Sequence, residues 1–152
     1  MMTVHQLASS FAYGDAITNH ILALDAALRE WGYTSRIYAE RVEARLHSLA
    51  QPDSAYLPAI ERPDDILIYH YSAYSANTQL YQRSRNRRLL VYHNITPPEY
   101  LTAYDADLAA VCRLGRDALP QLRDADLAAG VSETNRRELL AAGFDPRRVA
   151  VL

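Results

Sequence analysis

Two short apolar runs in the middle of the chain predict buried β-strands. Residues 66–71 read Ile-Leu-Ile-Tyr-His-Tyr, and residues 89–92 read Leu-Leu-Val-Tyr. Both runs are too short for a typical helix and lack regular polar alternation, a pattern typical of strands covered on both faces within a parallel sheet. The second run ends in His93-Asn94, and Thr96-Pro97-Pro98 then prevents the strand from continuing.

Segments with helical periodicity lie before and after these runs. Ile17, Ile21, Leu24 and Leu28 recur at three- and four-residue spacing and predict an amphipathic helix over residues 15–31. Three more helices are expected over residues 72–83, with Ser75 as a candidate cap, 105–119 and 132–142. Four more strands are expected over residues 3–9, 34–39, 126–131 and 148–152. Residues 40–50 read as a short helix or irregular piece, and residues 51–63, with three prolines, as an extended connection.

The alternation of predicted strands and helices indicates right-handed crossovers between parallel strands. We therefore expect an α/β fold with a Rossmann-like, doubly wound parallel sheet in three α/β/α layers. The length of 152 residues suits one domain over residues 1–152.

Composition narrows the class of protein. The net charge of −2 gives no reason to expect a nucleic-acid partner. Cys112 is the only cysteine, which excludes an internal disulfide and suits a cytoplasmic protein. No run approaches the roughly 20 apolar residues of a membrane span. A basic cluster at Arg83, Arg85, Arg87 and Arg88 favours a solvated loop, with contact to phosphate or anionic lipid at a membrane surface as the alternative.

Polar and small residues follow four of the predicted strands. Because parallel strands bring their carboxyl ends to one edge, where ligands bind in open α/β sheets, we expect these residues to form one site. Hydroxyl, amide and imidazole groups beside tyrosine rings suit a sugar, which needs many hydrogen bonds and a flat apolar contact. The candidates are Tyr13, Gly14, Asp15, His70, Tyr71, His93, Asn94, Ser132 and Glu133.

Other chemistries have weaker support. There is no G-x-G-x-x-G motif for a dinucleotide, and neither a Ser-His-Asp order nor an H-E-x-x-H motif for hydrolysis. His5, His20 and His47 have no spacing that suggests a metal, so we expect neither a metal nor a cofactor. The alternative for His93 is that it merely ends its strand through bonds to backbone.

Three segments resemble glycosyltransferases of the family 4-like, GT-B-fold type. They are residues 11–17, residues 91–100, and residues 126–140 followed by 143–145 and 149–152. The resemblance covers nearly the whole chain, but only the N-terminal, acceptor-binding domain of such an enzyme. The first loop has one glycine where many members have two.

The resemblance implies a retaining enzyme that transfers a sugar from a nucleotide-sugar to a glycan, lipid or small-molecule acceptor, usually without a metal. It implies that Gly14 lies near the donor phosphates or sugar, that His93 is catalytic and approaches the transferred sugar or acceptor hydroxyl, and that Ser132 and Glu133 lie at the cleft rim. The C-terminal nucleotide-sugar domain is absent from this sequence, so we expect no hexosyltransferase turnover from the chain alone.

Two alternatives belong to other classes of protein. One is a non-catalytic module that binds a sugar or a phosphorylated metabolite at the same edge. The other is a Rossmann-like domain whose exposed apolar surface forms a homodimer.

Overall fold

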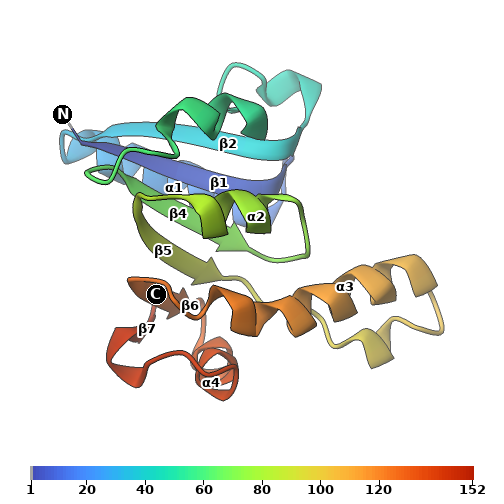
Figure 1. Cartoon of the computed structure of the whole chain (residues 1–152). Coiled ribbons are helices and arrows are strands. Elements are labelled where there is room, and N and C mark those ends of the chain that lie inside the picture. Colours follow the sequence, from blue (N-terminus) through green and yellow to red (C-terminus); the bar gives the residue numbers. More distant parts are fainter. Residues whose placement is uncertain (1) are drawn as a thin grey trace.

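The computed structural model describes residues 2–152 and confirms the predicted parallel α/β fold. All seven strands form one sheet in the order β3-β2-β1-β4-β5-β6-β7, and every pair of neighbours is parallel (Figure 1). The strands are β1 (Thr3–Phe11), β2 (Thr34–Val42), β3 (Gln51–Pro52), β4 (Ile66–Tyr71), β5 (Arg87–Tyr92), β6 (Leu127–Gly130) and β7 (Val149–Val151).

Helices cover both faces of the sheet in a Rossmann-like arrangement. Figure 1 shows α1 on one side of the sheet and α2 on the other. The α-helices are α1 (Ala16–Glu30), α2 (Asn77–Arg83), α3 (Ala106–Ala118) and α4 (Glu133–Ala141). Short 3-10 helices are η1 (Ala44–Leu46), η2 (Asp53–Ala59), η3 (Pro98–Tyr100), η4 (Leu119–Leu122) and η5 (Pro146–Arg148).

The ends of α1 follow from single residues in the sequence. The carboxylate of Asp15 accepts a hydrogen bond from the Thr18 N–H at 2.9 Å, which caps the first turn. Gly32 has a φ of 83°, the left-handed conformation that ends a helix and that glycine adopts without strain. The helix predicted over residues 15–31 is therefore confirmed.

The pleat of β4 and β5 sends alternate residues to different layers. Leu67, Tyr69 and Tyr71 belong to the larger buried cluster, which also contains residues of η2, α2, α3 and α4. Ile68, on the opposite face, packs with Leu28 of α1. Because neighbours in a strand point to opposite faces, His70 belongs to the α1 side and Tyr71 to the other side.

Three sequence predictions about the elements are wrong in detail. Residues 51–63 are not simply extended, since they contain the edge strand β3, which pairs with β2, and then η2. The helix predicted over residues 72–83 begins only at Asn77. The Ser75 hydroxyl accepts the Asn77 N–H within the turn before it and does not cap a longer helix. β1 extends through Phe11, beyond the end of the strand predicted over residues 3–9.

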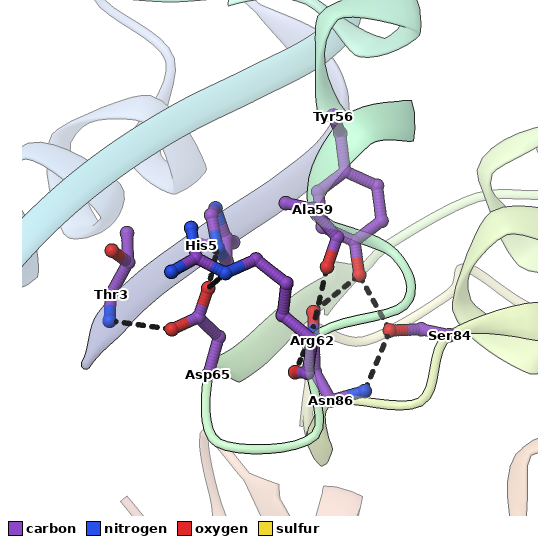
Figure 2. Close-up of polar contacts among 8 residues, drawn as sticks. All are labelled: Thr3, His5, Tyr56, Ala59, Arg62, Asp65, Ser84 and Asn86. Atoms are coloured by element: carbon purple, nitrogen blue, oxygen red, sulfur yellow. Dashed lines mark hydrogen bonds and ion pairs between the residues drawn. The ribbon is translucent and has the colours of Figure 1, made fainter. Parts of the chain in front are cut away.

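The amino-terminal edge of the sheet holds a buried polar network, drawn in Figure 2. Asp65 accepts from the Thr3 N–H at 2.9 Å, from His5 Nε2 at 3.2 Å and from Arg62 Nε at 3.3 Å. Burial alone would raise the pKa of Asp65, but these three donors together hold it below its usual value. Burial lowers the pKa of His5 despite Asp65, so His5 donates as a neutral imidazole.

A second part of this network ties η2 to the start of β5 (Figure 2). The Tyr56 hydroxyl donates to Asn86 Oδ1 at 2.6 Å, and Asn86 Nδ2 donates to the carbonyls of Ala59 and Arg62 at 3.0 and 2.6 Å. Desolvation raises the pKa of Tyr56 to about 12, so its hydroxyl stays protonated at neutral pH. These bonds fix the segment before β4, and the bond of His5 to Asp65 gives that histidine a structural role at the same edge.

The arginine cluster also lies at the amino-terminal edge. Arg87 and Arg88 begin β5 and do not belong to a loop. The Arg88 guanidinium donates to Asp124 Oδ2 at 2.9 Å. Its backbone N–H donates to Asp126 Oδ2 at 2.8 Å. Between residues 2 and 152, no helix is both long and apolar enough to cross a membrane.

Candidate functional site

The order of strands in the sheet places a topological switch point between β1 and β4. The chain runs from β1 outward to β2 and β3, then returns to the other side of β1 and continues through β4 to β7. In open α/β sheets, ligands bind at the carboxyl ends of the strands next to such a reversal. The segments that follow β1, β4, β5 and β6 all leave this edge, and they carry Gly14, the residues after Tyr71, His93 and Ser132.

The loop after β1 has a backbone conformation that Gly14 and a bond to Glu43 define. Gly14 has a φ of 76°, and a Cβ at this position would meet no atom within 4 Å, so glycine is required for the backbone turn and not for space. The Tyr13 N–H donates to Glu43 Oε2 at 2.8 Å, which ties the loop to the end of β2. The Tyr13 ring is 69% exposed, with the Arg45 guanidinium 4.2 Å from its centre. An exposed ring therefore lies at the carboxyl edge, on the β2 side of β1.

His70 and His93 form the buried part of the site. His70 is the fifth residue of β4, and His93 follows the last residue of β5 directly. Their exposed fractions are 1% and 8%, and His70 Nδ1 lies 3.0 Å from His93 Nε2. The sequence predicted that both would lie at this edge, and the structure brings their rings into direct contact.

Gln6 of β1 determines which His70 nitrogen carries the proton. The Gln6 amide nitrogen donates to the Ile21 carbonyl at 3.3 Å, so its Oε1 faces His70 Nε2 at 3.0 Å. An amide oxygen only accepts, so His70 Nε2 carries the hydrogen and His70 Nδ1 keeps a lone pair. His93 Nε2 must then donate its own hydrogen to His70 Nδ1.

A third imidazole, which the sequence analysis did not assign to the site, comes from α1. The ring of His20 has its centre 5.8 Å from that of His70 and 5.3 Å from that of His93. His20 is half-buried because it lies on the face of α1 that also carries Ile17, Ile21 and Leu24. A histidine within an otherwise apolar helix face was the signal available in the sequence, since polar groups are seldom buried without a reason.

Burial keeps the two strand histidines neutral. Desolvation is the main cause that lowers the pKa of His70 well below 6.5, and His93 and His20 lower it further. Desolvation also lowers the pKa of His93 to about 4, with a further decrease from His20 and an opposing increase from Asp15. At neutral pH both rings therefore offer hydrogen bonds and lone pairs without a positive charge.

Tyr71, expected to be near His70 in the site, points elsewhere. Its ring is buried on the other face of the sheet, and its hydroxyl donates to the Gly115 carbonyl of α3 at 2.6 Å. Adjacent residues of a strand cannot share a face, so the structure does not bring Tyr71 to the ligand edge with His70.

The remaining predicted residues lie around the start of α4. Ser132 caps this helix by accepting the Asn135 N–H at 3.1 Å, and its hydroxyl donates to Asn135 Oδ1 at 2.8 Å. Asn94 is exposed, and its Oδ1 accepts from Asn135 Nδ2 at 3.4 Å. Glu133 forms ion pairs with Arg136 and Arg137. Asn94 and Ser132 are thus linked through Asn135, while the Glu133 carboxylate is engaged within its own helix.

Searches of protein-family models and of curated proteins found no match to this chain.

Proposed function

We propose that this chain is the acceptor-binding domain of a retaining, GT-B-type glycosyltransferase. The observation that supports this most is that the Gly14 loop, His93 and Asn94 all follow strands at the carboxyl edge of a sheet that has its switch point between β1 and β4. Ligands of open α/β sheets bind at this position, and the residues present there suit a polyhydroxylated ligand.

The chemistry of these groups favours hydrogen bonding to a sugar over proton transfer. A histidine whose pKa is lowered to about 4 is a weak base at neutral pH, because its driving force for accepting a proton is small. A neutral imidazole still donates or accepts a hydrogen bond with a hydroxyl, and the exposed Tyr13 ring offers a flat surface for a sugar face. In this proposal His93 contacts the transferred sugar or the acceptor hydroxyl and orients it.

Transfer requires donor and acceptor in one cleft. In the proposed enzyme the nucleotide-sugar is held mainly by a second domain, and residues 1–152 hold the acceptor and close over the donor sugar. We therefore expect the isolated chain to bind an acceptor saccharide, glycolipid or small molecule without transferring a sugar to it.

Amide chemical-shift mapping by NMR tests this function. A panel of saccharides and nucleotide-sugars is titrated into the labelled chain, and at least one saccharide is expected to shift the amides of Gly14, Asn94 and Ser132. Asn94→Ala should weaken this binding by about tenfold, since it removes an exposed amide that hydrogen-bonds to the ligand. Arg85→Ala, an exposed arginine at the opposite edge, is the matched control and should leave the affinity unchanged.

Two results would contradict the proposal. If no ligand of the panel shifts amides at this edge, the acceptor-binding function is wrong. If the isolated chain transfers sugar from a nucleotide-sugar with turnover, the division of work between two domains is wrong.

A further inference from the structure

We propose that His20, His70 and His93 form a binding site for a divalent transition-metal ion of the zinc type. Each histidine offers one ring nitrogen, and these three nitrogens lie within 4.8 Å of one another. Neutral imidazole is a preferred ligand of Zn²⁺ and its neighbours in the first transition row. This inference does not depend on the glycosyltransferase proposal.

The distances suit a zinc ion after a small adjustment. Zn–N bonds of about 2.0–2.1 Å at tetrahedral angles place two ligand nitrogens about 3.3 Å apart. The His70 Nδ1 to His93 Nε2 distance of 3.0 Å needs to open only slightly. His20 must approach further, and it is the half-buried member of the three.

The structure also supplies the outer contact that orients a metal-binding histidine. Such histidines usually donate their other ring N–H to an oxygen, which fixes the tautomer and aims the lone pair at the metal. Gln6 Oε1 does this for His70 Nε2 at 3.0 Å, and Gln6 is itself held by the Ile21 carbonyl. Gln6 is completely buried, so its orientation is set by these two bonds.

Protons balance when the metal binds. In the metal-free protein, His93 Nε2 carries a hydrogen that it donates to His70 Nδ1. To bind metal through Nε2, His93 moves this hydrogen to its own Nδ1, so the ring stays neutral and no proton is released. Because burial has already lowered the pKa values of His70 and His93, protons compete weakly with the metal at neutral pH.

Three protein ligands leave a coordination position free. Structural zinc sites are usually closed by four protein ligands, whereas three histidines with an open position are typical of sites that bind water or a substrate oxygen. The three histidines lie beneath the carboxyl edge of β4 and β5. The bound ion would lie beneath this edge, with the half-buried His20 as the most exposed of its three ligands.

Isothermal titration of Zn²⁺ into the tag-free full chain, first treated with a chelator, tests the site. We expect one ion per chain, and we expect His20→Gln to weaken binding by at least about tenfold. His20 is half-buried, so this variant should remain folded, which circular dichroism checks. His47→Gln, an exposed histidine outside the cluster, is the matched control and should bind Zn²⁺ as the wild type does.

Two further measurements separate a built site from surface binding. Co²⁺ should give the intense visible absorption of a tetrahedral complex in the wild type and lose it in His20→Gln. Gln6→Met keeps the side-chain volume but removes the oxygen that orients His70, and it should weaken Zn²⁺ binding by about tenfold or more.

The proposal is overturned if the wild type shows no saturable Zn²⁺ binding, or if His20→Gln binds as tightly as the wild type. The test contains no sugar, so a negative result leaves acceptor binding unaffected, and a positive result stands even if no saccharide binds.

Discussion

The buried imidazoles of this fold should make its stability depend on pH at unusually mild acidity. His93 has a pKa of about 4 in the folded chain, against an ordinary value of 6.5. As the pH falls, this imidazole is therefore protonated in the unfolded chain before it is protonated in the folded chain. Stability from this group is complete above about pH 6.5 and is lost as the pH falls toward the folded pKa. This dependence of stability on pH is opposite in sign to that of a histidine stabilised by a carboxylate.

The magnitude follows from the two pKa values. Proton linkage with 6.5 and about 4 gives a loss of about 2 kcal/mol from His93 alone between about pH 7 and about pH 5. His70 and His5 have lowered pKa values as well and add to the loss in the same direction. Carboxylates with lowered pKa values, such as Asp65, act mainly below about pH 5, outside this window.

Urea unfolding in chelator-treated buffer at about pH 7 and about pH 5 measures the effect. The free energy of unfolding of the wild type should fall by about 2 kcal/mol or more between these conditions. In His93→Gln the fall should be smaller by at least about 1 kcal/mol, since glutamine does not titrate yet still offers an N–H to His70. His47→Gln, whose ring is exposed, should behave as the wild type. Equal pH dependence in the wild type and His93→Gln would refute the reasoning.

Two substitutions test the packing that positions the site, both measured by urea unfolding at neutral pH. Tyr71→Phe removes the hydroxyl that bonds to the Gly115 carbonyl at 2.6 Å, and it should destabilise the fold by about 1–3 kcal/mol because a buried acceptor is left without its donor. A change smaller than about 0.5 kcal/mol would contradict that assignment. Gly130→Ala would place a Cβ 2.5 Å from the Arg136 backbone nitrogen at the start of α4, and it should destabilise by about 1–3 kcal/mol or more. An alanine tolerated there would show that α4 shifts freely against β6.

Local sequence was sufficient for the elements that carry strong signals. The apolar runs at residues 66–71 and 89–92 predicted β4 and β5. The helices predicted over residues 15–31 and 132–142 have caps at Asp15 and Ser132 and are followed by positive φ values at Gly32 and Gly143. Each of these signals acts within a few residues, so no distant contact was needed to interpret it. β3 escaped prediction because two residues contain no periodicity; only pairing with β2 makes them a strand.

The carboxyl edge as a ligand site was also predictable, because parallel strands must deliver their ends together. The side chains that share that edge were decided by the pleat of the strands and by the packing of distant elements. The pleat separates His70 from Tyr71 although they are adjacent. The packing of α1 adds His20, and the pairing of β1 with β4 adds Gln6. The sequence by itself determined the order of elements and the polar strand ends. Only the tertiary structure, through the register of a helix against a sheet, decided that three imidazoles meet at one point.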